Sequence, residues 1–290
     1  MNFVGLSNDN FECQVTKEYH RIEKGLSLSN PRRPFGSEPA MRLASLIPRA
    51  WDAGGGKAPY IDYATDALAA LEVWNETGDI TDLVAPRVRA WQPSQSDQES
   101  YGALFSTRRS VRDFEPRSAI PLETIRAAIA DAQNTPSVCN RQPWRTHYYE
   151  GEFAQEVLRH HSGSAAFASQ IPAVLVVTSR TGLFSGTGER NQRWIDGGMF
   201  AMSVVWALHS RGAANCFLNW SRDNSSSNKL RAAADIPEEE DIIVLIAVGR
   251  PRNGYRVARS TRRDETEVLE VHGATRHRNT IGSTSATTRN

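Results

Sequence analysis

The sequence is poor in lysine and cysteine, carries almost no net charge and has no long apolar run. Four lysines stand against 30 arginines, an excess that coding bias explains as well as function does. Three scattered cysteines are too few for a disulfide framework or a zinc cluster, so we expect a reducing cytoplasmic location and no bound metal. A net charge of +1 argues against nonspecific nucleic-acid binding. No window approaches 18 uninterrupted apolar residues and the start lacks a signal-peptide pattern, so we expect no membrane contact and no export signal.

The common hydrolytic and nucleotide-binding signatures are also missing. There is no Gly-x-Ser-x-Gly, His-Glu-x-x-His or Cys-x-x-Cys pattern. The glycines at 186 and 188 lack the third glycine of a dinucleotide-binding turn, which argues against a nicotinamide held in a Rossmann crevice. The glycine-rich stretch 51–57 lacks the spacing of a phosphate-binding loop, and we expect a flexible loop there. His160, His161 and His209 lack acidic neighbours at metal-ligand spacing, so we predict solvated helix residues.

The hydrophobic pattern predicts a chain of alternating helices and strands. Continuous apolar runs at 172–178 and 241–248 have strand length, which indicates strands covered on both faces. Further strands are predicted at 146–150 and 214–219. Helices are predicted at 65–77, 98–107, 121–132, 152–160, 194–208 and 227–234. The helix at 194–208 is apolar on nearly every side and should be buried, with Asp196 near its start suited to the helix dipole.

The first 97 residues differ in texture from the rest, with short helical pieces among glycines and prolines. We therefore expect an N-terminal extension over 1–97, a main domain over 98–273 and a disordered tail over 274–290, with the polar linker at 93–97 as the boundary. Within the extension, 19–26 alternates charged and aromatic residues. Two interpretations stay open: a helix that docks on the main domain through Ile22 and Leu26, or a contact with a substrate or polymer.

The residues that carry chemistry gather between Arg108 and Trp144. Three guanidinium groups and a hydroxyl suited to gripping a phosphate lie within five residues: Arg108, Arg109, Ser110 and Arg112. A helix then leads to a loop with the hydrogen-bonding side chains of Ser137, Asn140 and Gln142. A second arginine pair, Arg262 and Arg263, could converge on the same anion. The pattern suits a phosphorylated cofactor with a polar ring.

In this order, the motifs resemble those of the nitroreductase family, the FMN-dependent flavoproteins. The resemblance covers roughly residues 98–273. It rests on Arg-Arg-Ser-Val-Arg-Asp-Phe at 108–114, Pro-Ser-Val-Cys-Asn-Arg-Gln-Pro-Trp at 136–144, the apolar helix after Asp196, the strand end Gly-Arg-Pro at 249–251, and the late Arg-Arg followed by Glu-Val-Leu. It implies an α+β fold, with a mixed, mainly antiparallel sheet flanked by helices, in an intertwined homodimer with FMN at the subunit interface.

The resemblance also implies a role for each site residue. The FMN phosphate and ribityl chain would be held by Arg108, Arg109, Ser110 and Arg112, with Arg262 or Arg263 closing on them. The isoalloxazine would be lined from the partner subunit by Pro136, Ser137, Val138 and Asn140, while Gln142 reaches the flavin or stabilises the loop. The strand end at Leu218 and Asn219 would offer backbone donors toward flavin N5. Trp144 is expected in the core, and Cys139 is expected to pack rather than react.

The implied activity is a two-step hydride transfer in which NAD(P)H reduces the flavin and a small electron-poor acceptor then reoxidises it. No protein side chain is predicted as catalytic, because the flavin carries the hydride. One alternative is FMN-dependent oxidation of a biosynthetic intermediate, since the 19–26 motif is similar to extensions on nitroreductase-like proteins of surface-polysaccharide biosynthesis. Another is a non-catalytic flavin-binding assembly protein. The sequence leaves the substrate, the choice of NADH or NADPH and the role of 1–97 open.

Overall fold

A computed structural model describes residues 7–116 and 118–272 of the chain. It divides into two compact units, Met1–Val257 and Ala258–Asn290. The second unit contains a 3₁₀ turn at Glu265–Glu267. In the described part of the chain, no helix is long and apolar enough to cross a membrane. The tail predicted over 274–290 lies outside the described residues.

The first unit is built on one antiparallel sheet with strand order β1-β2-β4-β3. Its strands are β1 (Trp144–Glu150), β2 (Ala173–Arg180), β3 (Ala214–Asn219) and β4 (Glu240–Gly249). The two apolar runs of the sequence form the central pair, β2 and β4, where both faces are covered. The predicted α+β class and the predicted strands are confirmed.

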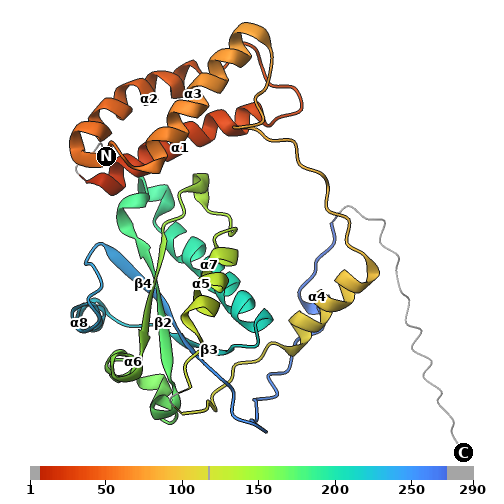
Figure 1. Ribbon diagram of the computed structural model, residues 1–290, viewed down its shortest axis with the longest axis vertical. Helices are drawn as coiled ribbons and strands as arrows, with labels where there is room; N and C mark the ends of the chain where they lie inside the picture. Colours follow the sequence, from red (N-terminus) through yellow and green to blue (C-terminus); the bar gives the residue numbers. More distant parts are fainter. Residues whose placement is uncertain (1–6, 117, 273–290) are drawn as a thin grey trace, which may run out of the picture. The chain divides into compact units, whose positions relative to one another are not determined.

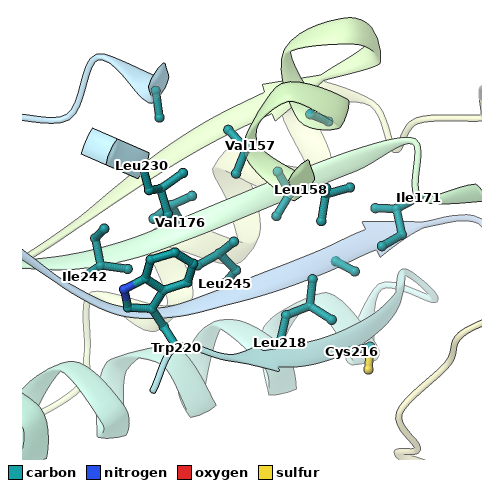
Figure 2. Packing of buried hydrophobic residues seen from close by; sticks show 14 of the residues in the cluster. Val157, Leu158, Ile171, Val176, Cys216, Leu218, Trp220, Leu230, Ile242 and Leu245 are labelled. Atoms are coloured by element: carbon teal, nitrogen blue, oxygen red, sulfur yellow. The ribbon is translucent and has the colours of Figure 1, made fainter. Parts of the chain in front are cut away.

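Helices cover both faces of this sheet (Figure 1). Helices α5 (Leu122–Ala132) and α7 (Gln192–Ser210) pack on one face, and α6 (Gly151–Arg159) and α8 (Asn224–Ala234) on the other. Because side chains alternate along a strand, Val174 and Val176 of β2 face α6 and α8, whereas Leu175 and Val177 face α5 and α7. Figure 2 shows the hydrophobic core between the sheet and helices α6 and α8, with Leu230 of α8 near Val176.

Local signals explain where two helices begin earlier than predicted. Helix α3 (Pro59–Thr77) starts at a proline, whose missing N–H costs nothing in the first turn. Helix α4 (Gln95–Thr107) starts after Ser94, which forms a reciprocal capping box with Asp97. The polar linker predicted over 93–97 is therefore partly the first turn of α4. The boundary between extension and main domain stays a prediction.

Helix α7 differs from its prediction in two ways. It begins at Gln192, so Asp196 lies beyond the first turn and does not serve the helix dipole. The helix is also not buried all round in the single chain, because Trp194, Ile195 and Met199 are 45%, 51% and 39% exposed. Helix α4 covers another part of α7, where the rings of Phe105 and Trp206 lie 4.4 Å apart.

The N-terminal helices α1 (Asn8–Leu26), α2 (Ser37–Ala50) and α3 form a group with its own hydrophobic core. Ile22 and Leu26 are buried in that core, so the prediction that they dock on the main domain is wrong. The stretch predicted as a flexible loop contains a π-helical turn, Trp51–Gly55. Polar contacts join α1 to β2: Arg180 Nη1 lies 3.1 Å from Asp9 Oδ1 and 2.8 Å from Glu12 Oε2.

Candidate functional site

The arginine-rich segment runs from the end of α4 along the outer edge of the sheet. The backbone N–H of Val111 donates to Asn215 O of β3 at 3.0 Å. Val111 and Phe114 are buried in the core, and Phe114 pairs with Pro251, so the first motif meets the Gly-Arg-Pro strand end. These two apolar anchors leave Arg112, between them, exposed to solvent.

The first three residues of the segment are partly engaged within the chain. The guanidinium of Arg108 lies over the Trp206 ring at 5.8 Å. Arg109 Nη1 donates to Arg108 O at 2.9 Å. The Ser110 hydroxyl contacts the thiol of Cys216, whose pKa is raised by burial against the opposing effect of nearby arginines. The raised pKa keeps Cys216 a neutral packing group.

Arg112 shares a pocket of about 340 Å³ with Leu218 and Asn219 at the end of β3. The structure therefore brings part of the predicted phosphate grip together with the predicted strand end. The remaining lining residues are His161, Ser162, Gly163, Phe167, Cys216, Phe217, Ser221 and Arg222. Arg222 donates from Nη2 to Ser162 Oγ at 2.6 Å and places a second guanidinium in the pocket. Arg222 was not predicted as a site residue, although it lies only three residues beyond the strand end at Asn219.

His161 supports this pocket and is not the solvated residue that was predicted. It is 8% exposed, with Nε2 3.1 Å from Asn219 O and Nδ1 3.0 Å from Ser164 Oγ. Burial lowers the pKa of His161, with the hydrogen bond to Asn219 O opposing. A neutral ring with its proton on Nε2 donates to Asn219 O and fixes the end of β3. Its position after α6 gave no signal of this role.

The amide loop between α5 and β1 has an unusual backbone. Cys139, Asn140 and Gln142 have φ values of 49°, 53° and 45°, in the left-handed region that side chains disfavour. Ser137 Oγ accepts from Gln142 N at 2.9 Å, and Gln142 Nε2 donates to Asn140 Oδ1 at 3.3 Å. The loop is thus cross-braced by the residues that were predicted to line a ligand. Such strain persists only where the surroundings impose it.

Arg141 ties the loop to the interior of the protein. Its side chain is buried, and Nε donates to Val138 O at 3.1 Å. Nη1 and Nη2 lie 2.9 and 2.8 Å from the two carboxylate oxygens of Glu189, while Nη1 also donates to Cys13 Sγ of α1 at 3.2 Å. Sequence reasoning missed this role, because both partners are distant in the chain.

Asp196 holds the other side of the loop. The carboxylate is fully buried and accepts from Val138 N at 3.2 Å and from Gln192 Nε2 at 2.8 Å. Burial raises the pKa of Asp196, and these two hydrogen bonds oppose the rise. Trp144 after the loop is buried as predicted, stacked on Phe200 at 4.7 Å.

The two predicted halves of the site line different pockets of one chain. Arg112, Leu218 and Asn219 line the pocket beside β3, whereas Asn140 and Gln142 line another beside the N-terminal helices. The late arginines at 262 and 263 belong to the second unit, so their closure on the same anion stays a prediction. The ligand-binding roles of all the predicted site residues also stay predictions: Arg108, Arg109, Ser110, Arg112, Pro136, Ser137, Val138, Asn140, Gln142, Leu218 and Asn219.

A model of the nitroreductase family matches residues 105–161 and 150–250, which together span half of the chain. The chain belongs to the nitroreductase family. The family assignment made from the motifs is confirmed. The matched region contains the sheet, its covering helices and all residues that line the pocket beside β3.

Nitroreductase-family folds are also found among solved structures. A nitroreductase family protein from Streptococcus pneumoniae matches with a TM-score of 0.52 at 19% identity, over 59% of this chain and 100% of that one. An NAD(P)H:FMN oxidoreductase from Staphylococcus epidermidis matches with a TM-score of 0.53 at 16% identity, over 64% and 100%. A nitroreductase in complex with FMN from Desulfovibrio desulfuricans gives 0.51 at 17%, over 62% and 98%. At these identities the likeness establishes the fold.

Among curated proteins, an iodotyrosine deiodinase from Haliscomenobacter hydrossis is 25% identical over 206 residues. The match spans 61% of this chain and 90% of that protein. The nitroreductase-family match begins at residue 105, so α1, α2, α3 and most of α4 precede it.

Proposed function

We propose that this chain is an FMN-dependent oxidoreductase that uses NAD(P)H to reduce an electron-poor small molecule. The observation that carries the proposal is the pocket in which Arg112 lies with the β3 strand end, Leu218 and Asn219. Two findings support the choice of cofactor. The chain belongs to the nitroreductase family, and its structural neighbours include an NAD(P)H:FMN oxidoreductase and a nitroreductase in complex with FMN.

The chemistry of the pocket fits the two ends of FMN. The guanidinium groups of Arg112 and Arg222 and the hydroxyl of Ser162 are donors of the kind that hold a phosphate. Phe167 and Leu218 offer apolar surface suited to a flat ring. Cationic donors beside an apolar wall are what a phosphorylated ring compound requires.

Bound FMN would supply the redox chemistry, which is the transfer of a hydride from NAD(P)H to the acceptor. The chain's own residues bind and orient. Arg112 neutralises phosphate charge, His161 holds the carbonyl of Asn219, and the braced loop at 137–142 presents fixed amide groups. For a quinone acceptor the balance is one hydride and one proton per quinone, giving the hydroquinone and NAD(P)⁺.

The second half of the site comes from a second copy of the chain. Support lies in the exposed apolar side chains of α7 and α4, among them Trp194, Ile195 and Phe105, since clustered exposed apolar residues mark interaction surfaces. In the dimer, the loop at 137–142 of one copy faces the flavin held by the other. Light scattering should give twice the 32.2 kDa mass of the chain. A monomer that still binds FMN tightly would contradict the shared site.

The test is FMN affinity in Arg112→Ala against Arg126→Ala. Losing a charge-assisted hydrogen bond costs about 1.5 to 3 kcal/mol, so we expect FMN to bind roughly 10- to 150-fold more weakly to Arg112→Ala. Arg126 is exposed on α5, and its variant should bind FMN like the wild type. Equal affinities in all three proteins would place the phosphate elsewhere.

The range of acceptors is tested by NAD(P)H-dependent turnover of the holoenzyme. Menadione and a nitroaromatic test the proposed activity, and iodotyrosine is included because the curated relative is an iodotyrosine deiodinase. A bound flavin that NAD(P)H cannot reduce would favour the oxidase or the non-catalytic alternative.

A further inference from the structure

A pocket of about 410 Å³ lies between the N-terminal helices and the amide loop. One side is formed by α1 and α3, which precede the part of the chain that matches the nitroreductase family. The other side is formed by the loop and the start of β1. The lining residues are Glu12, Thr16, Tyr19, Ala58, Pro59, Tyr60, Tyr63, Gln133, Asn140, Arg141, Gln142, Trp144 and Arg180.

The N-terminal side of the pocket is a wall of three tyrosines. The rings of Tyr19 and Tyr63 meet edge to face, with centroids 6.2 Å apart and an angle of 67°. Tyr19 and Tyr60 are buried, whereas Tyr63 is 54% exposed and stands at the rim. Burial raises the pKa of Tyr19 to about 12 and also raises that of Tyr60, so both stay neutral phenols. The wall therefore offers aromatic surface without charge.

The opposite side of the pocket offers amide groups held in fixed orientations. Gln142 Nε2 donates to Asn140 Oδ1, and both residues have a left-handed backbone. Buried Arg141 lies between them in the chain and donates from Nε to Val138 O of the same loop. Trp144 Nε1 donates to Gln133 Oε1 at 2.7 Å, which turns that amide so that its NH₂ group can donate elsewhere. Pre-oriented amides recognise polar substituents on a ring.

The charges around the pocket are matched in pairs. Arg180 binds Glu12 through two nitrogens, at 2.8 and 3.0 Å, and also contacts Asp9. Arg141 is paired with Glu189. A charged ligand would find no unmatched partner in these pairs and would lose hydration on entering. The pocket therefore favours an uncharged ligand.

We propose that this pocket, with its wall of Tyr19, Tyr60 and Tyr63, binds the acceptor as an uncharged planar ring compound carrying polar substituents. The N-terminal helices then set acceptor specificity. This inference rests on the proposed function, because the loop at 140–142 is the part expected to face the flavin. It assigns α1 and α3 a role in recognition, one of the two interpretations that the sequence left open for the 19–26 stretch.

The test uses the holoenzyme with menadione as an uncharged ring and 1,4-naphthoquinone-2-sulfonate as a charged ring of similar shape. Tyr63→Ala removes a rim ring, while Tyr63→Phe keeps it. Phe153→Ala, on the exposed surface of α6, is the matched control. Loss of one aromatic contact should raise the menadione Kd, measured by calorimetry on the oxidised protein, about 3- to 10-fold in Tyr63→Ala. Tyr63→Phe and Phe153→Ala should match the wild type.

The same variants separate this inference from the proposed function. We expect Tyr63→Ala to raise KM for menadione with little change in kcat, and the wild type to bind the sulfonate more weakly than menadione. Wild-type menadione affinity in Tyr63→Ala, or tighter binding of the sulfonate, would overturn the pocket assignment while leaving flavin activity intact. Protein that binds no FMN would refute the proposed function. Calorimetry of the same variants would still decide whether the pocket binds the ring.

Discussion

Replacing Arg141 with Met should destabilise the protein and loosen the amide loop. Arg141 is 2% exposed, and its guanidinium contacts four acceptor atoms: Val138 O, Cys13 Sγ and both carboxylate oxygens of Glu189. Met fills similar space and offers none of these hydrogen bonds. The change therefore removes the polar anchor and preserves most of the packing.

The magnitude follows from what the substitution leaves behind. Removing one partner of a buried ion pair costs about 3 to 5 kcal/mol, because the other charge stays buried and unpaired. The Glu189 side chain is 19% exposed and keeps the hydrogen bond from Ser185 N at 2.6 Å. We therefore expect the lower end, about 3 kcal/mol of unfolding free energy in urea at pH 7. Arg190→Met, at an exposed neighbour, should change stability by less than about 0.5 kcal/mol.

The pH dependence gives a second check. Burial alone would raise the pKa of Glu189, but hydrogen bonds from Arg141 and Ser185 lower it below its ordinary value of 4.5. A lowered carboxyl pKa contributes stability above that ordinary value and loses it as pH falls through the folded pKa. The difference in unfolding free energy between the wild type and Arg141→Met should thus become smaller below pH 4.5. Adding Glu189→Gln should recover part of the loss. If Arg141→Met had the stability of the wild type and the same dependence of stability on pH, Arg141 would not anchor the loop.

Further perturbations test the packing and the sheet. A Cβ on Gly197 would lie 2.7 Å from Ile243 Cγ1, so Gly197→Ala should lower the unfolding free energy by about 1 to 3 kcal/mol. Gly198 has open space around it, so Gly198→Ala should raise the unfolding free energy by up to about 1 kcal/mol. Equal changes in the two variants would contradict the packing of α7 on β4. Burial alone would raise the pKa of Glu240, but its hydrogen bonds, one of them with His147 at 2.7 Å, lower this pKa. Ionised Glu240 therefore stabilises the fold at pH values above the ordinary carboxyl pKa, and this stabilisation is lost as the pH falls through the folded-state pKa. Glu240→Gln should lower the unfolding free energy by about 1.5 to 3 kcal/mol at pH 7 and should reduce the loss of stability at acid pH. An unchanged loss at acid pH would assign it to other carboxyl groups.

The sheet and its helices were predictable because their signals are local. The apolar runs of β2 and β4 have strand length, and their neighbours in sequence show where they end. The family motifs were equally readable, since each lies within about ten residues. Helix starts were less accurate where the cap lay upstream, as for Ser94 before α4.

The supports of the site could not be read from the sequence because they join distant residues. Arg141 meets Cys13 across 128 positions and Glu189 across 48. His161 reaches Asn219 across 58, and the fold alone brings them together. Helix α7 shows a different limit. Its apolar pattern predicted burial, but a local pattern does not show what covers the helix. Trp194 and Ile195 are exposed in the single chain, and a second copy is proposed to cover them.

The most direct test of the central claim is the flavin content of the purified chain. The proposed function predicts yellow protein that releases FMN on heat denaturation, in a ratio of one per chain, and whose flavin absorbance is bleached by NAD(P)H without oxygen and restored by menadione. Colourless protein that also fails to bind added FMN would contradict the claim.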